Sequence, residues 1–319
     1  RDDAVASYGP SLRGAREIVP LLLQLFHEFD VAATWAIVGF LFADSREELE
    51  RFSPTRKPKY LDPRLSPYGD AIGESEADDP FRLAPSLIEQ IGRTPRQEIA
   101  THTFSHYYCG EQGQTPDDFR ADLAAAQALA RLRGHELQSI IFPRNQFDAS
   151  YLGILPEFGI RSYRGNPAGG SWAFTDGSGS RRSWKRLARL SDRYIGSSHG
   201  TVSWDSVHQR SGLTDVRASC FLAPYRPTLR SLEELRLRRL VGRIRAAARE
   251  GSLVHLWWHP HNFGLHMAEN LSFLRAALSA FADLQERYGM LSLSMAEVDE
   301  AVRGRVDTPP PPPGRGRDG

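Results

Sequence analysis

The feature that most constrains the fold is a short apolar run late in the chain that ends in histidines. Residues 253–258 are aliphatic or aromatic except for His255, and His259 and Pro260 follow directly. Such a run is typical of a strand buried on both faces, as in a parallel sheet whose strands are joined by helices. His259 then falls at the carboxyl end of a strand, where barrel enzymes place their chemistry. His255, inside the strand, is predicted to be a satisfied core residue.

A second short strand, at residues 97–101, delivers two further histidines. His102 follows it directly and His106 comes four residues later. If the chain turns helical after the strand, this spacing puts both imidazoles on one face, close enough to share one metal ion. Thr103 and Ser105 can cap the turn or orient a ring nitrogen. Taken alone, the pair is weak evidence for a metal, and two surface or capping histidines that bind nothing are the better interpretation.

The rest of the chain alternates between helical and strand periodicity. A polar stretch at 44–85 and a glycine- and serine-rich stretch at 164–183 are predicted to be loops. The alternation predicts an α/β domain with a parallel sheet or barrel. The predicted helices are 11–29, one capped by Thr115 and Gly134, 149–158, 228–249 and 269–288, and the predicted strands are 31–42, 97–101, 137–143, 160–163, 216–222, 253–258 and 290–295.

Three motifs in this order resemble those of the polysaccharide deacetylase family, the group with the NodB homology domain. His102-Thr103-Phe104-Ser105-His106 matches the family's metal motif, and Leu256-Trp257-Trp258-His259 resembles its late strand with a catalytic histidine. Between them, Pro143-Arg144 stands in place of an arginine–proline motif, with the two residues in the opposite order. The resemblance covers residues 11–299. It implies a distorted, TIM-like (β/α) barrel whose first strand is missing from this sequence.

The resemblance also implies roles for individual residues. His102 and His106 would bind one divalent metal ion, zinc by expectation, with cobalt or nickel as alternatives. His259 would be the acid that protonates the leaving amine, with His261 as a second candidate. Arg144 would orient a carboxylate base, a role that Asn145 or Gln146 could share.

A third metal ligand and the general base are harder to place. In the family both are aspartates at the end of the first strand, and here only Asp2 and Asp3 form such a pair. No apolar run precedes them, so a solvated acidic pair is the better interpretation. The two carboxylates are therefore expected upstream of Arg1, with Asp2 and Asp3 as the alternative. Cys109, three residues after His106, is a weaker candidate ligand because the family pattern does not use it.

The function implied is removal of N-acetyl groups from a polysaccharide or glycan precursor by a metal-dependent hydrolase. An inactive carbohydrate-binding relative and a hydrolase of another non-peptide carbon–nitrogen bond remain alternatives. Aromatic residues at 60, 68 and 81 are candidates for one rim of a sugar cleft, and Trp172 and Trp184 for loop contacts with a glycan. An irregular surface insertion and core packing are the competing interpretations.

Composition and the chain's ends limit the remaining possibilities. A net charge of +1 gives no electrostatic reason to expect nucleic acid as a partner, and no run is long enough to span a membrane. Two cysteines make no disulfide framework. We expect one catalytic domain at residues 1–300 and a disordered tail rich in proline, glycine and arginine at 301–319. A cytoplasmic location is favoured, although family members work on both sides of the membrane; the oligomeric state is left open.

Overall fold

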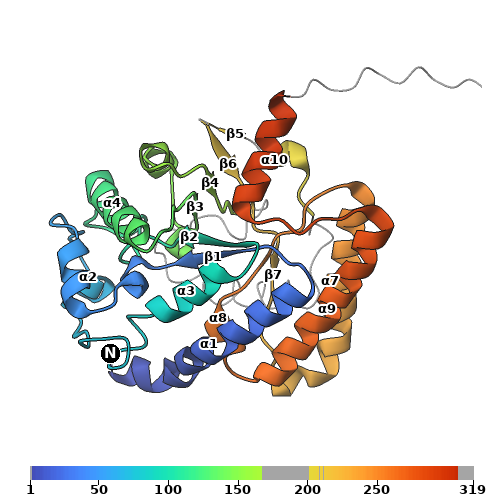
Figure 1. Cartoon of the computed structure of the whole chain (residues 1–319), viewed down its shortest axis with the longest axis horizontal. Helices are drawn as coiled ribbons and strands as arrows, with labels where there is room; N and C mark the ends of the chain where they lie inside the picture. Colours follow the sequence, from blue (N-terminus) through green and yellow to red (C-terminus); the bar gives the residue numbers. More distant parts are fainter. Residues whose placement is uncertain (1, 167–200, 208, 211, 308–319) are drawn as a thin grey trace, which may run out of the picture.

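The computed structural model describes residues 2–166, 201–207, 209, 210 and 212–307 (Figure 1). Within these residues the main sheet has the strand order β1-β2-β3-β4-β6-β5. Neighbouring strands are parallel except β6 and β5, which are antiparallel. This confirms the predicted α/β fold with a parallel sheet. The strands are β1 (Ala33–Ile37), β2 (Gln97–Thr101), β3 (Ser139–Ile140), β4 (Ser162–Tyr163), β5 (Gln209–Arg210) and β6 (Leu213–Asp215).

A second, two-stranded parallel sheet pairs β7 (Cys220–Phe221) with β8 (Leu256–Trp257). The predicted strand at 253–258 therefore exists but is shorter. Its expected burial on both faces is wrong, because Leu256 and Trp257 are only half-buried and line a large cavity. The predicted strand at 216–222 is likewise reduced to β7.

Helices cover the sheets and connect the strands (Figure 1). Helix α1 packs on α8 and also touches α3 and α9, while α7 packs along α9. The helices are α1 (Asp2–Glu28), α2 (Arg46–Phe52), α3 (Pro85–Arg93), α4 (Pro116–Leu132), α5 (Ala149–Leu152), α7 (Glu233–Glu250), α8 (Pro260–Phe263), α9 (Met267–Tyr288) and α10 (Met295–Asp307). Helix α10 ends beyond the point where the tail was expected to begin, and residues 308–319 lie outside the described part.

Helix α4 forms where its caps predict. The Thr115 hydroxyl accepts from the amide of Asp118, and the Asp118 carboxylate accepts from the Thr115 amide, which is a capping box. After the helix, Gly134 adopts a φ of +79°, which a glycine tolerates without strain. Local sequence alone thus fixes both ends of this helix.

Two predictions failed because the same capping chemistry was overlooked. Residues 290–295 form no strand; instead Ser294 caps α10, its hydroxyl accepting from the amide of Glu297. The predicted loop at 44–85 contains α2, which Ser45 caps in the same way through the amide of Glu48. Both segments carry the Ser-x-x-Glu signature of a helix start, which outweighed the strand and loop patterns.

The predicted strand at 31–42 also ends early. Beyond Ile37 the chain passes into a 3₁₀ turn at Gly39–Phe42. Gly39 lies so close to the histidine loop that a Cβ there would be 2.7 Å from the Cα of Phe104. This contact, distant in sequence, fixes where β1 stops.

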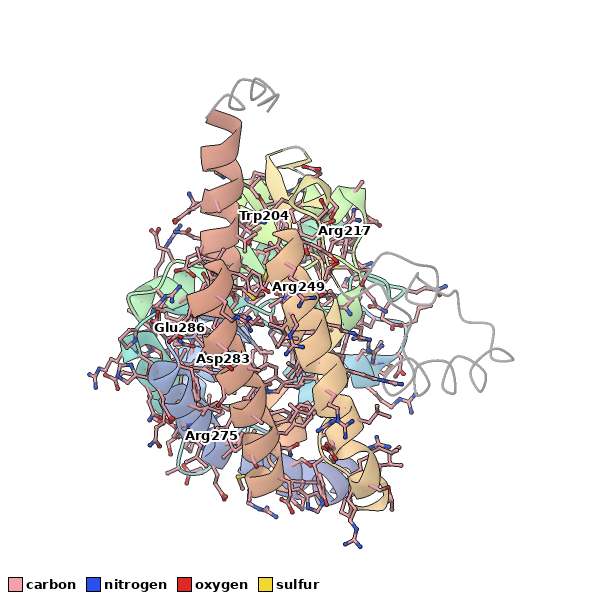
Figure 2. All side chains as sticks on the ribbon, turned by 90° about the vertical axis from the view of Figure 1, so that its right-hand side faces the viewer. Trp204, Arg217, Arg249, Arg275, Asp283 and Glu286 are labelled. Carbon is pink, nitrogen blue, oxygen red and sulfur yellow. The ribbon has the colours of Figure 1, made fainter. Side chains whose placement is uncertain are left out.

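The outer faces of α7 and α9 are charged. Figure 2 shows Arg249 of α7 and Arg275, Asp283 and Glu286 of α9 on the surface, and all four are exposed. The arginine-rich face of α7 therefore lies in solvent, as expected. None of the described helices has both the length and the apolar character needed to cross a bilayer.

Candidate active site

The carboxyl ends of the parallel strands bring the candidate residues together. His102 follows β2, Arg144 follows β3, Arg164 follows β4 and His259 follows β8. Parallel strands end at one edge of a sheet, so side chains that are far apart in sequence become neighbours there. The side chains of His102, Arg164 and His259 all line one cavity, so these three groups face the same space.

The two histidines of the first motif lie side by side. Their ring centroids are 4.8 Å apart at an angle of 68°. The Nδ1 atom of His102 is 2.6 Å from the carbonyl oxygen of Ile141, so this nitrogen carries the proton and Nε2 keeps its lone pair. Burial lowers the pKa of both rings, that of His106 to about 4, so both are neutral at pH 7. Neutral imidazoles are the form that binds a metal ion.

The expected helical turn between the two histidines is wrong. Residues 102–106 form a loop in which Thr103 (φ +66°) and His106 (φ +56°) adopt left-handed conformations. The Thr103 amide donates to the Thr101 hydroxyl at 2.9 Å, and the Thr103 hydroxyl accepts from the Tyr107 amide at 2.6 Å. These bonds fold the loop back, so the rings meet through the loop's conformation rather than through helical spacing.

Asp122 of α4 holds this loop from beneath and was missed in the sequence. Its carboxylate is fully buried and accepts from the amides of Phe104, at 2.6 Å, and Ser105, at 3.1 Å. It also accepts from the Ser105 hydroxyl. Burial raises the pKa of Asp122 to about 6. The only sequence signal was an acidic residue on the inner face of a predicted amphipathic helix.

His259 lies at the start of α8, on the other side of the site. Its ring stacks on that of His261, with centroids 5.1 Å apart, and meets the Trp257 ring edge-on at 6.0 Å. The chain is not extended here, as had been assumed for His261, but enters α8 at Pro260. His259 is exposed toward the cavity, and its partial burial, with His261, Arg164 and His106 nearby, lowers its pKa.

Arg144 occupies a more exposed position than expected. It adopts a left-handed conformation (φ +54°), and its Nη1 donates to Glu111 Oε1 at 2.6 Å. Its guanidinium lies 4.2 Å above the ring of Tyr108, which in turn packs against His106 at 5.1 Å. Gln146 accepts from the Gly110 amide at 3.3 Å. Arg144 thus forms part of the rim next to His106.

Arg164, which the sequence did not single out, is the arginine at the centre. Only 7% of it is exposed, and it lies 4.5 Å from the centre of the Trp257 ring. Its Nη2 donates to the Asn145 side chain at 2.7 Å. His255 lies close by, with Nδ1 3.2 Å from the Val216 carbonyl oxygen, and burial together with the charge of Arg164 lowers its pKa to about 4.

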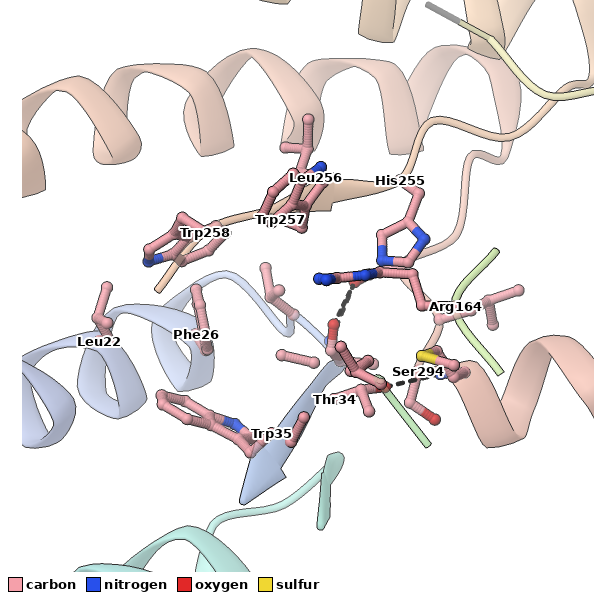
Figure 3. A pocket seen from close by; sticks show the side chains of 18 of the residues that line it. Leu22, Phe26, Thr34, Trp35, Arg164, His255, Leu256, Trp257, Trp258 and Ser294 are labelled. Carbon is pink, nitrogen blue, oxygen red and sulfur yellow. Dashed lines mark hydrogen bonds between the residues drawn. The ribbon is translucent and has the colours of Figure 1, made fainter. Parts of the chain in front are cut away.

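Arg164, His255 and Trp257 border a cavity of about 740 Å³. Figure 3 shows Trp257 and Trp258 facing Trp35 of β1 across it, with Phe26 of α1 between them and Arg164 reaching in. The cavity separates β1 from β8, so the two sheets do not meet at this point. His102 and His259 are among its lining residues.

The described residues provide part of a metal site. Among them, no three His, Cys, Asp or Glu side chains are grouped to hold an ion. His102 and His106 fit as two ligands, whereas Asp2 and Asp3 open α1 and follow no strand. Cys109 lies in an apolar cluster with Tyr107 and Phe119, where burial raises the pKa of its thiol.

Comparison with known proteins finds a family match over part of the chain. Residues 8–163, which include β1 to β4 and both histidines of the loop, match the model for polysaccharide deacetylases. Over these residues the chain is similar to the polysaccharide deacetylase family. Members of the family are hydrolases of N-acetyl amide bonds in carbohydrates. Arg164 and His259 lie outside the matched segment.

A solved structure has the same fold. The crystal structure of a Mycobacterium smegmatis protein assigned as a polysaccharide deacetylase aligns with a TM-score of 0.50 and 15% sequence identity, covering 97% of this chain and 83% of that chain. At this identity the likeness concerns the fold. A search of curated proteins finds no significant match.

The aromatic rim expected for a sugar-binding member of the polysaccharide deacetylase family is only partly present. Tyr60 is buried, its hydroxyl accepting from the Tyr108 amide at 2.9 Å, so it supports the rim from within. Tyr68 packs on Phe40, while Phe81 lines the cavity. Trp172 and Trp184 lie outside the described residues. Tyr108, which contacts both His106 and Arg144, is an aromatic face that sequence reasoning missed.

Proposed function

We propose that this chain is a metal-dependent hydrolase that removes N-acetyl groups from a polysaccharide or a glycan precursor. The observation that carries the proposal is the pair of neutral imidazoles, His102 and His106, at the end of β2 within the family-matched residues. The two rings are close enough to bind one ion, and the bond from His102 to Ile141 leaves Nε2 for that purpose. Zinc is the proposed ion, with cobalt or nickel as alternatives. When bound, it would polarise the amide carbonyl and make water more acidic.

A strand that carries the missing carboxylates would fit between β1 and β8. The amide of Ala33 donates to Arg96, so those of Thr34 and Ala36 point away from β2. The amides of Cys220 and Leu222 donate to His255 and Trp257, so the backbone groups of Leu256 and Trp258 point away from β7. Both open edges border the apolar cavity.

One more parallel strand in this gap would join the two sheets into the distorted barrel that the sequence suggests. Its carboxyl end would lie beside His102 and His259, where a third ligand and a general base are needed. In this proposal, a segment before Arg1 supplies these two carboxylates. Asp2 and Asp3 are the less favoured source, because they begin a helix.

Each step of amide hydrolysis then has a group to perform it. A carboxylate takes a proton from water, water adds to the carbonyl carbon, and the carbon–nitrogen bond breaks to give acetate and a free amine. His259 donates the proton that the amine needs. Its pKa is now held low by burial and by neighbouring cationic groups, so a carboxylate placed beside it would raise that pKa toward the working range. In this proposal Arg144 contributes to the rim through Tyr108.

One observation favours a second candidate, an inactive carbohydrate-binding relative. No three-residue metal cluster exists among the described residues, as expected for a protein that binds glycan without cleaving it. Cleavage of another non-peptide carbon–nitrogen bond is the third possibility. It is less favoured because the family-matched segment belongs to carbohydrate deacetylases.

A calorimetric zinc titration after chelator treatment, followed by an assay for acetate release from N-acetylglucosamine oligomers, tests the proposal. One-to-one zinc binding and zinc-dependent release of acetate are expected once both carboxylates are present. Zinc binding without acetate release from these oligomers or from simple acetamides would favour the inactive relative. Release from simple acetamides alone would favour the third possibility.

A further inference from the structure

We propose that Arg164 forms a carboxylate-binding site at the head of the cavity, between His102 and His259. The ligand is one carboxylate, supplied either by a protein side chain or by free acetate. The inference deepens the proposed function, because acetate is the second product of that reaction. It concerns binding alone, however, and needs neither a metal ion nor turnover to be tested.

The first observation is that a charged side chain is buried without a matching charge. Arg164 is 7% exposed, and its Nε atom is buried with no hydrogen-bond partner among the described residues. Burial lowers the pKa of Arg164 to about 10, and no carboxylate among the described residues raises it again. An uncompensated buried charge is costly, which is why such groups are found paired.

The second observation is that the guanidinium is held in place for a ligand. One face lies 4.5 Å from the Trp257 ring, and Nη2 is anchored at 2.7 Å by the Asn145 side chain. Asn145 itself adopts a left-handed conformation (φ +56°), and its carbonyl oxygen accepts from Asn166 at 3.3 Å. Stacking and anchoring leave the Nε edge free, and such an edge matches the geometry of a carboxylate. In Figure 3 the Arg164 side chain reaches into the cavity.

The third observation is the chemistry of the surrounding groups. His102, His255 and His259 line the same cavity as Arg164. Arg144, by contrast, already has Glu111 as its partner. Within the described part of the chain, the groups around Arg164 are therefore three imidazoles and no carboxylate paired with it. A bound carboxylate would neutralise the charge of the arginine.

The test is a titration with sodium acetate against sodium chloride at equal ionic strength, using metal-free protein. The Arg164 Nε–H resonance, identified by its absence in Arg164→Gln, reports binding directly. Acetate is expected to shift this resonance in the wild type, and binding should be at least about tenfold weaker in Arg164→Gln. Arg249→Gln, at an exposed position of α7, is the matched control and should bind acetate like the wild type. If Arg164→Gln does not fold, Arg164→Lys serves instead, since it keeps the charge but loses the planar fork.

Two outcomes support the inference, and they distinguish the source of the carboxylate. A resonance that moves with acetate identifies a free carboxylate as the ligand. A resonance that ignores acetate in this chain but moves when an N-terminally extended chain supplies a further strand identifies a carboxylate of the protein. A resonance that moves in neither experiment would overturn the inference. Absence of zinc binding or of deacetylation would count against the proposed function while leaving this result intact.

Discussion

The Nδ1 atom of His102 lies 2.6 Å from the carbonyl oxygen of Ile141, so the end of β3 orients the ring that follows β2. This bond selects the tautomer that offers Nε2 to a ligand. It also explains why two strands distant in sequence are needed to position this one imidazole.

Replacing either loop histidine should weaken metal binding, whereas replacing His259 should not. His102→Ala and His106→Ala each remove one of two adjacent imidazoles, and we expect at least about a tenfold loss of zinc affinity by calorimetry. His259→Ala should keep the affinity and slow acetate release. Equal zinc affinity in the wild type and both loop variants would refute the assignment of these ligands.

Asp122 should matter for stability and for metal binding although it touches neither histidine. In Asp122→Ala the amides of Phe104 and Ser105 and the Ser105 hydroxyl lose their acceptor in a buried setting. Stranded buried donors cost about 1–3 kcal/mol each, so we expect a loss of about 3 kcal/mol or more in urea unfolding. Zinc affinity should fall with it.

A matched control is available on the same helix. Asp117 is exposed in the first turn of α4, and Asp117→Asn should change the free energy of unfolding by no more than about 0.5 kcal/mol. Equal effects of the two aspartate substitutions would show that Asp122 does not hold the loop.

The metal-free protein should lose stability as the pH falls from 6.5 to 4. Burial lowers the pKa of His106 and His255 from 6.5 to about 4. In this range the unfolded chain binds protons that the folded chain does not, so the free energy of unfolding rises with pH. It is highest above pH 6.5 and is lost on acidification. A shift of this size corresponds to about 3 kcal/mol per group.

Urea unfolding at a series of pH values measures this slope. His255→Leu removes one such group, and the slope should fall by about one proton between pH 4 and 6.5. His27→Leu, at an exposed position of α1, is the control and should leave the slope unchanged. A slope unaffected by His255→Leu would show that His255 titrates normally in the folded state.

Close packing of two glycines joins α1 to α8. A Cβ on Gly14 would lie 2.1 Å from the carbonyl oxygen of Gly264, which requires the two helices to separate. We expect Gly14→Ala to cost about 1–3 kcal/mol in thermal unfolding and to slow acetate release by shifting α8 and its histidines. Gly242→Ala in α7 meets no atom within 4 Å and should instead stabilise by about 0.5–1 kcal/mol. Stabilisation by both substitutions would contradict the packing described.

The sequence by itself determined the features that depend on local pattern. The alternation of strand and helix periods gave the α/β class, the Thr115 capping box gave the start of α4, and His102 and His259 were placed at strand ends. Such features depend on side-chain period and on hydrogen bonds within a few residues, which a single stretch of sequence contains. The Ser-x-x-Glu starts of α2 and α10 are local signals of the same kind. The prediction gave more weight to the loop and strand patterns there, and the structure shows that the helix signal was the correct one.

Only the tertiary structure decided which groups face one another. Arg164 replaces Arg144 at the centre because it follows β4 and lines the same cavity as His102, while the left-handed backbone of Arg144 directs its side chain to Glu111. Asp122 reaches the histidine loop from a helix that begins ten residues after it, and the cavity exists because β1 and β8 do not pair. These relationships follow from the order and register of distant strands and from packing across them, which local periodicity does not encode.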